Sequence, residues 1–171
     1  MNIGASSESD YGYYFSWGNT TGYTGTNNEF SSSGYNSTTG KSLTGNIPSN
    51  STYDAAVKSW GGSWRMPTKD EFVELTNNTT ITRVTINGKA GVKFANKNNS
   101  SKYIFLPPAG AYTSSYPNNT DNRVYLWTST YKDSTNAYEA TFYNGNGGTN
   151  NTPEDTWTRY MGLPIRPILV I

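Results

Sequence analysis

Gly61-Gly62-Ser63-Trp64-Arg65-Met66-Pro67-Thr68-Lys69-Asp70-Glu71 is the stretch of sequence from which the rest of the chain is best read. Its two glycines are typical of a helix end, and they predict that the helix-prone segment 52–60 stops there. Thr68, followed three residues later by Glu71, has the pattern of a capping box. We therefore predict a second helix over 69–77, directly after a short connection.

Downstream of this stretch, alternating polar and apolar residues predict a series of short strands. They are expected at Ile81–Ile86, Val92–Phe94, Tyr103–Leu106, Arg123–Thr130, Ala137–Tyr143, Thr156–Met161 and Ile165–Ile171. Asn87-Gly88 favours a hairpin turn between the first two. The last segment is almost wholly apolar, which favours a central place in the sheet. The pattern indicates one loop-rich α+β domain, 1–171, in which two helices flank a twisted antiparallel sheet.

Upstream, the sequence is dominated by turn-forming residues. Tyr11–Gly18 is predicted to be a short aromatic strand, and residues 19–50 are rich in Gly, Ser, Thr and Asn, which predicts a long loop. The predicted core is aromatic and aliphatic: Trp60, Trp64, Phe72, Leu75, Leu106, Trp127, Ile165 and Ile168. Five Trp and fourteen Tyr can bury enough apolar area for a core although only 33% of residues are hydrophobic.

The composition excludes several classes of function. The chain has 171 residues, a formal net charge of +1, and neither cysteine nor histidine. It cannot form disulfides, thiolate metal sites or a thiol nucleophile, and it lacks the usual general base. Its 13 basic residues are scattered, which argues against a nucleic-acid partner. No apolar run is long enough to insert into a membrane. We expect no cofactor and no metal.

The carboxylates offer one alternative to a binding function. Asp70 and Glu71 are expected to cap a helix, and Glu74 to lie on its solvated face. Glu154 and Asp155 could bind a hard cation or could simply be surface groups, and their spacing matches no calcium loop. We predict that the chain is not an enzyme, with no catalytic residue. A metal-free carboxylate hydrolase, which would need two carboxylates converging in a pocket, is the alternative.

Arginines in aromatic or proline-rich surroundings form a second group. Arg65, Arg159 and Arg166 could form an anion site. The alternative, which we favour, is that each guanidinium donates hydrogen bonds to carbonyls of long loops that have no secondary-structure partner.

Tyrosine and asparagine in the second half of the chain are the candidate ligand-binding residues. Tyrosine provides rigid contact area and asparagine provides adaptable hydrogen bonds, a mixture that antibody loops also use. Turn propensity alone explains the asparagines but not the tyrosines beside them. The candidates are Tyr112, Tyr116, Asn118, Asn119, Asn122, Tyr125, Tyr131, Asp133, Asn136, Tyr138, Tyr143, Asn144, Asn146 and Trp157.

Several motifs, in order along the chain, resemble the Fibrobacter succinogenes major paralogous domain family of bacterial surface proteins. The matching segments are Tyr11–Gly18, Gly61–Thr68 with Glu71, Ile104–Gly110, Trp127–Thr130, Ala137-Tyr138 with Phe142, and Arg159–Ile168. The family's opening Asp and Glu are Tyr13 and Asn19 here. The resemblance implies the C-type lectin fold, in its formylglycine-generating-enzyme branch.

The same resemblance limits the function. The enzymes of that branch depend on cysteines or histidines, and calcium-dependent lectins carry motifs that this chain lacks. The variable proteins of diversity-generating retroelements share the fold, and residues 125–157 resemble their variable region. The implied function is recognition of a cell-surface protein or glycan, at an extracellular, cell-surface or virion-surface location. A non-diversified adhesin or a fibre or pilus-tip module is the alternative.

Overall fold

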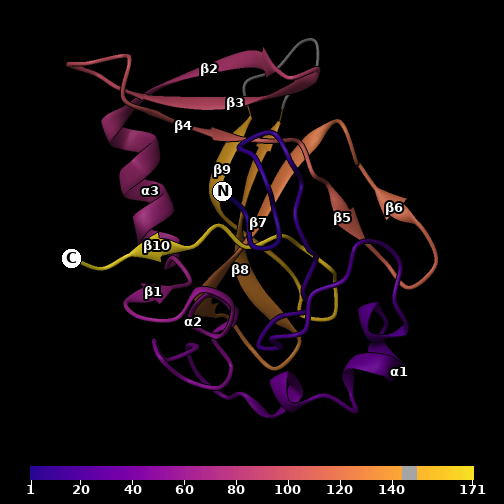
Figure 1. The fold of residues 1–171 in the computed structure, drawn as a ribbon. Helices are drawn as coiled ribbons and strands as arrows, with labels where there is room; N and C mark the ends of the chain where they lie inside the picture. The colour runs from indigo at the N-terminus through magenta and orange to yellow at the C-terminus, as the bar shows by residue number, and fades with distance from the viewer. Residues whose placement is uncertain (144–149) are drawn as a thin grey trace.

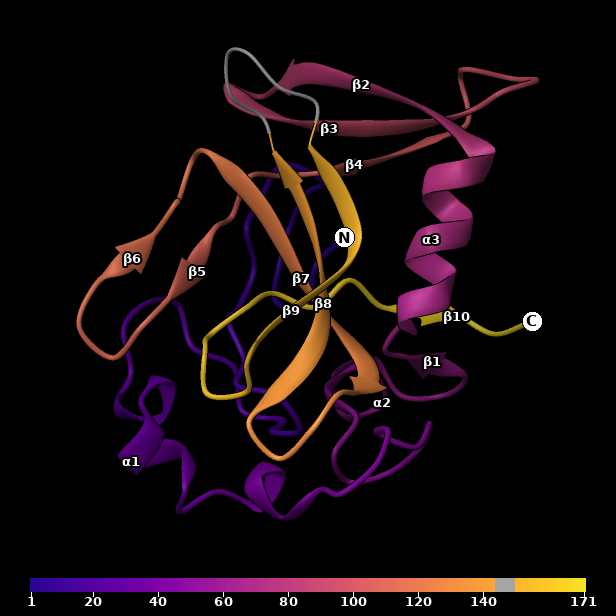
Figure 2. The same ribbon diagram turned by 180° about the vertical axis from the view of Figure 1, so that it is seen from behind.

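In a computed structural model, residues 1–143 and 150–171 are described, and they form an α+β fold (Figures 1 and 2). The helices are α1 (Ser32–Tyr35), α2 (Ala55–Trp60) and α3 (Lys69–Asn78), with 3-10 turns η1 (Asn28–Phe30) and η2 (Thr39–Ser42). The strands are β1 (Trp64–Arg65), β2 (Thr79–Ile86), β3 (Lys89–Asn96), β4 (Tyr103–Leu106), β5 (Ala111–Tyr112), β6 (Pro117–Asn118), β7 (Arg123–Tyr131), β8 (Asn136–Tyr143), β9 (Asn151–Thr158) and β10 (Ile168–Leu169).

The antiparallel sheet β7-β8-β9 is the middle layer of the molecule, with a core on each face. Successive strand residues point to opposite faces. Val124 and Leu126 therefore join Phe72 of α3 and Phe94 of β3 in one core. Trp127, on the other face, packs with aromatic residues of the N-terminal segment and with the segment that precedes β10. Both faces of β7 are thus buried along most of its length.

The predicted single sheet is wrong, because the strands within the described residues form four small antiparallel sheets. The sheet β2-β3-β4 crosses one end of β7-β8-β9, while β5-β6 and β1-β10 lie at the sides (Figure 1). The C-terminal segment is also not central. Pro164 and Pro167 have no N–H to donate to a ladder. Only Ile168 and Leu169 pair, and they pair with β1.

The long loop predicted for 19–50 contains α1, η1 and η2 instead. Arg159, which is 1% exposed, fastens this segment. Its guanidinium donates to the carbonyls of Gly40 and Leu43, at 2.6 and 3.1 Å, and lies over the Trp17 ring. Arg166 donates to the Phe105 carbonyl. Arg159 and Arg166 therefore donate hydrogen bonds to backbone carbonyls, as predicted. Arg65 differs, because its main partner is the Glu71 carboxylate of α3, at 2.5 Å.

The aromatic segment 11–18 pairs less than predicted. Only Tyr14 and Phe15 form isolated bridges, the first to Tyr23 and the second to Leu163. Gly12 and Gly18, with φ of 74° and 80°, bend the chain at either side and prevent a longer ladder. The Phe15–Leu163 bridge nevertheless brings the first and last parts of the chain side by side.

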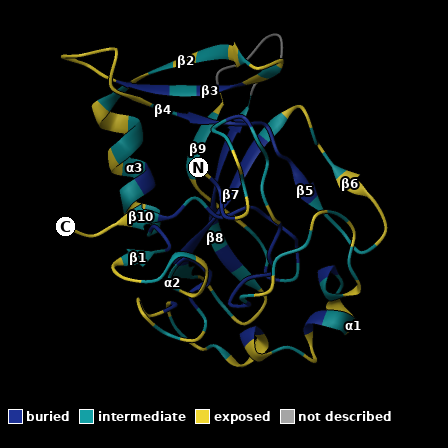
Figure 3. Cartoon of the chain, in the orientation of Figure 1, coloured by how far each residue is buried: buried dark blue, intermediate teal, exposed yellow. Residues whose placement is uncertain are grey.

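The second predicted helix is confirmed, including its capping box: Thr68 accepts from the Glu71 N–H while the Glu71 carboxylate accepts from the Thr68 N–H. The first helix begins at Ala55, later than predicted, because Asp54 caps it. Of the predicted core, Phe72, Leu106, Trp127 and Ile165 are buried. The other four are only half-buried: Trp60, Trp64, Leu75 and Ile168 (Figure 3).

Candidate functional site

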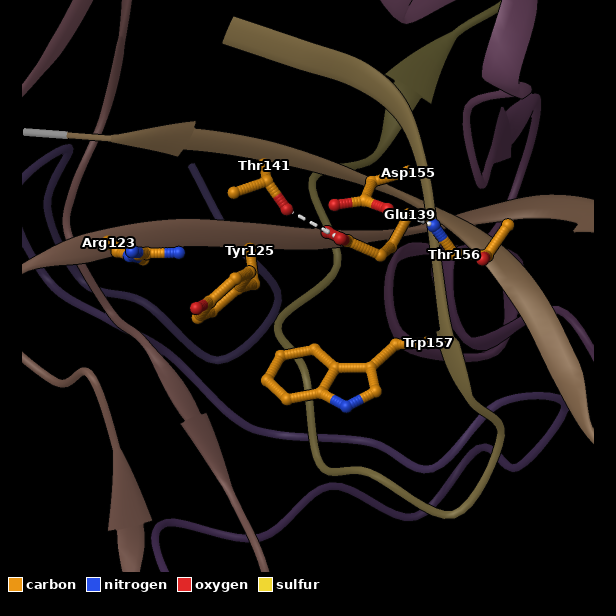
Figure 4. A pocket seen from close by; sticks show the side chains of 7 residues that line it. All are labelled: Arg123, Tyr125, Glu139, Thr141, Asp155, Thr156 and Trp157. Carbon is orange, nitrogen blue, oxygen red and sulfur yellow. Dashed lines mark hydrogen bonds between the residues drawn. The ribbon is translucent and has the colours of Figure 1, made fainter. Parts of the chain in front are cut away.

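A hollow of about 190 Å³ opens on one face of the sheet β7-β8-β9 (Figure 4). We call it the sheet-face hollow. It is lined by Arg123 and Tyr125 of β7, Glu139 and Thr141 of β8, and Asp155, Thr156 and Trp157 of β9. Trp127 lies on the same face and is fully buried in the core with Phe15. The hollow therefore continues the face that the N-terminal segment covers.

A bulge in β9 shapes this face. Glu139 pairs with Asp155, but the next pair of the ladder is Thr141 with Thr152. One residue of β8 thus faces two residues of β9 between these pairs. Pro153 is one of the two, and proline suits an irregular edge strand because it cannot donate to a ladder. The bulge bends the edge strand beside Glu139.

Glu139 is the chemically unusual member of the hollow. Its side chain is buried, with the residue 2% exposed. Oε1 accepts a hydrogen bond from the Thr141 hydroxyl at 2.5 Å, and Oε2 has no partner among the described residues. Burial raises the pKa of this carboxyl to about 8, and the neighbouring Asp155 carboxylate acts in the same direction, against the Thr141 hydrogen bond. Glu139 is therefore mostly protonated at neutral pH.

Two aromatic rings form the side of the hollow opposite the carboxyls. Tyr125 and Trp157 meet edge to face with ring centroids 4.8 Å apart. Asn119 adopts a left-handed conformation with φ 54° and donates to the Tyr125 hydroxyl at 2.9 Å. Figure 4 shows both rings below Glu139 and Asp155. The hollow thus combines carboxyl oxygens with an ordered aromatic wall.

Arg123 lies at the end of the hollow away from the carboxyls. In the ladder it pairs with Tyr143, whereas Glu139 pairs with Trp127. The guanidinium lies 4.9 Å from the centre of the Tyr143 ring, and its buried Nε has no hydrogen-bond partner among the described residues. The hollow is therefore positive at one end and carries its carboxyls at the other.

The structure brings together only part of the predicted ligand-binding set. Tyr125 and Trp157 line the hollow, and Asn119, Asn118 and Tyr143 lie beside it. Tyr112 packs edge to face on Tyr14 at 4.6 Å, and Tyr116 and Asn122 are exposed in neighbouring turns. Asn144 and Asn146 lie outside the described residues.

Four predicted residues lie elsewhere. Tyr131 packs near Trp17 at the far end of β7, with the Arg159 guanidinium 5.7 Å from its ring centre. Asp133 accepts from the backbone N–H of Asn136 at 2.7 Å, which closes the turn between β7 and β8. Tyr138 is on the opposite face of the sheet, under the ammonium groups of two lysines. These residues do not share a surface with the hollow.

Sequence reasoning missed Glu139, Thr141 and Arg123. The available signal was the alternation in β8, where Ala137, Glu139 and Thr141 occupy one face and Ala140 and Phe142 the other. A charged residue between small ones on an inward face marks a polar pocket. Of the acidic pair 154–155, Glu154 forms a surface ion pair with Lys69 at 3.2 Å, and only Asp155 reaches the hollow.

Within the described residues, each helix is too short or too polar to cross a membrane. Comparison of the chain with protein-family models, with curated proteins and with solved structures found no match.

Proposed function

We propose that this chain is a recognition domain that binds a cell-surface ligand through the sheet-face hollow and the turns beside it. In this proposal the domain acts outside the cell or on a virion, and its fold is that of the C-type lectins. The observation that carries the proposal is the hollow itself, in which an aromatic pair faces a buried carboxyl oxygen that none of the described residues bonds. Protein binding sites combine a few aromatic anchors with polar groups that fix orientation in this way.

Three features support the fold assignment. The first and last segments lie side by side through the Phe15–Leu163 bridge and the hydrogen bond from Ile3 to Ile165. The helices α2 and α3 come before the central strands, in the order that the sequence pattern predicts. Long irregular segments are held by buried polar side chains such as Arg159.

The surface around the hollow supports recognition of a large ligand. Tyr116 is 58% exposed at the β5–β6 turn, and Asn119 and Asn122 are exposed in the loop before β7. Of these, Asn119 is linked directly to the hollow by its hydrogen bond to the Tyr125 hydroxyl, and it provides a polar residue at the rim. Such a rim can exclude water around a few central contacts, which is how binding energy is concentrated in protein interfaces.

An array of purified extracellular protein domains and of glycans tests the proposal. The wild-type chain should capture at least one member, and Trp157→Ala should lower that binding at least tenfold while the variant keeps a cooperative unfolding transition above the assay temperature. Tyr138→Ala, on the opposite face, is the matched control and should bind normally. Equal capture by both variants, or no capture by the wild type, would overturn the proposal.

A second candidate function rests on the pair Glu139 and Asp155. A buried carboxyl with a raised pKa beside an exposed carboxylate is the arrangement that glycoside hydrolases use for acid and nucleophile. Turnover of aryl glycosides that disappears in both Glu139→Gln and Asp155→Asn would establish this activity. Absence of turnover over a broad substrate panel would leave recognition as the function.

The recognition proposal has a diversified and a fixed form. Residues 125–157 resemble the variable region of retroelement-diversified proteins, and within them Tyr125, Tyr143 and Trp157 lie at or beside the hollow. A neighbouring reverse transcriptase gene with a near-copy of the codons for 123–166, differing at adenines, would establish the diversified form. A genome that has neither the reverse transcriptase gene nor the near-copy would favour the fixed form, in which the domain is a non-diversified adhesin or fibre-tip module.

A further inference from the structure

We propose that the sheet-face hollow is a subsite for a primary ammonium group, the end of a lysine side chain on the partner protein. The inference rests on the proposed recognition function and deepens it by naming the chemistry of the central contact. It starts from Oε2 of Glu139, a buried carboxyl oxygen inside a hollow that has no hydrogen-bond partner in the part of the chain that the structure describes. Buried polar atoms without partners are uncommon in folded proteins, and a ligand donor is one of the few ways to satisfy them.

The position of Asp155 favours a charged donor. It is the ladder partner of Glu139, so the two side chains leave neighbouring strands on the same face. The backbone N–H of Thr156 donates to Asp155 Oδ1 at 2.8 Å, and this bond holds the carboxylate near the mouth of the hollow. A primary ammonium carries three donors and can reach both carboxyls at once. A hydroxyl has one donor and no charge to set against two carboxylates.

The aromatic wall suits the same group. Tyr125 and Trp157 lie across the hollow from the carboxyls (Figure 4). The edge-to-face contact between them, with ring centroids 4.8 Å apart, fixes the orientation of the two rings. An ammonium between carboxylates and aromatic rings gains attraction from the rings in addition to its ion pairs, and the methylene stem of a lysine packs on the same rings.

Arg123 fixes the direction in which such a ligand lies. Its guanidinium is at the other end of the hollow, stacked on Tyr143. It repels an ammonium placed at that end and favours an acceptor oxygen there. A lysine residue has both groups, since its backbone carbonyl follows the side chain that ends in the ammonium. The lysine would therefore point its ammonium toward Glu139.

Binding of an ammonium would be coupled to loss of a proton. Glu139 has a pKa of about 8 without ligand, set by burial and by Asp155 and opposed by Thr141. Tyr125 and Arg123 are the other ionisable groups that line the hollow. The ammonium binds the ionised form of Glu139 best, so affinity should rise with pH until Glu139 is ionised. A lysine ammonium, with an ordinary pKa of about 10.4, stays charged over that range.

The test uses Nα-acetyl-lysine methylamide as the probe and its Nε-acetylated form, which has no charge, as the control. Binding to the whole chain is followed by ¹H–¹⁵N chemical shifts and by calorimetry in two buffers of different ionisation enthalpy. From pH 6.5 to pH 8.5 the ionised fraction of Glu139 rises about 25-fold, so the probe's Kd should fall by a similar factor, with up to one proton released. The Nε-acetylated form should not bind.

Glu139→Gln should raise the Kd at pH 8.5 at least tenfold and remove its pH dependence, and Asp155→Asn should raise it several-fold. Glu154→Gln is the matched control, one residue away but outside the hollow, and should bind like the wild type. Equal binding of the two probes, a pH-independent Kd, or shifts produced by methyl glycosides and not by the lysine probe would overturn the ammonium subsite. If array capture is lost in Trp157→Ala but kept in Glu139→Gln, recognition stands and the subsite is wrong.

Discussion

Replacing Glu139 by glutamine should stabilise the fold relative to the wild type, and this stabilisation should be larger at neutral and alkaline pH than at acid pH. In the folded chain this carboxyl has a pKa of about 8, chiefly because burial disfavours its charge, whereas its ordinary value is 4.5. Between these pH values the unfolded chain has lost the proton and the folded chain has kept it. The free energy of unfolding of the wild type therefore falls as pH rises from about 4.5 to about 8, and above that pH this group causes no further change while its full cost remains.

The size of the effect follows from the interval between the two pKa values. One pKa unit corresponds to about 1.4 kcal/mol, so an interval of about 3.5 units amounts to about 5 kcal/mol. Typical domains have only about 5–15 kcal/mol of total stability, which makes this a large fraction. Glutamine has nearly the same shape and does not titrate. The difference in unfolding free energy between variant and wild type should therefore grow by about 5 kcal/mol from pH 4 to pH 9.

Urea unfolding followed by tryptophan fluorescence measures this difference at each pH. Two other carboxyls whose pKa burial raises, those of Asp54 and Glu29, are present in both proteins and cancel in the comparison. Glu154→Gln provides the control, since it makes the same carboxyl-to-amide change at an exposed position of the same strand as Asp155, outside the hollow. A Glu139→Gln difference that stays constant from pH 5 to pH 9 would refute the account of the buried carboxyl.

Three further substitutions test the framework that holds the site. Arg159→Met removes the donors to the Gly40 carbonyl and its neighbours, and should cost about 3 kcal/mol in urea unfolding with faster hydrogen exchange over 35–43. Trp127→Ala opens a cavity in the core and should cost about 3–5 kcal/mol by calorimetry; a loss below about 1 kcal/mol would contradict its burial. Thr68→Ala should cost about 1 kcal/mol, and Thr68→Ser should recover most of it, because the cap needs only a hydroxyl.

The features that could be predicted from the sequence are those decided by residues close to one another in the chain. The capping box of α3 depends on Thr68 and Glu71 alone. The turn between β2 and β3 needs positive φ at two positions, and Asn87 and Gly88 supply it with φ of 50° and 77°. Trp127 was predicted to be buried because a large ring on an alternating strand gains most from the core.

The features that could not be predicted depend on distant partners. The last segment is apolar enough for a central strand, yet its prolines leave two pairing residues, and the partner they find is β1. Residues 19–50 carry little helical pattern, and α1 exists because Tyr35 packs inward and its hydroxyl meets the Trp17 carbonyl at 2.7 Å. A local pattern gives no information about such contacts.

The candidate site combines both kinds of feature. Alternation places Tyr125 and Glu139 on the same face as Trp127, and that part is readable from the sequence. Whether this face is covered depends on distant segments such as the one that contains Phe15, which packs on Trp127. The tyrosines named from composition therefore lie on different faces of the sheet, with Tyr125 at the hollow and Tyr138 on the opposite face.

A single strand, β7, carries both a central core residue and residues that line the proposed binding hollow. The C-terminal half of β7 carries Trp127, which is clamped by a hydrogen bond to the Phe15 carbonyl at 2.7 Å and packed by the N-terminal segment. The N-terminal half carries Arg123 and Tyr125, which border the hollow and whose outward contacts come from loop residues such as Asn119. Tyr125 is only 5% exposed and belongs to the same core cluster as Trp127, so it is part of the fold as well as of the hollow. Substitutions at Arg123 and at the exposed loop residue Asn119 should leave the Trp127 core intact. In the proposed recognition function, the exposed loop positions beside the hollow would be the ones that change what the domain binds while the Trp127 core persists.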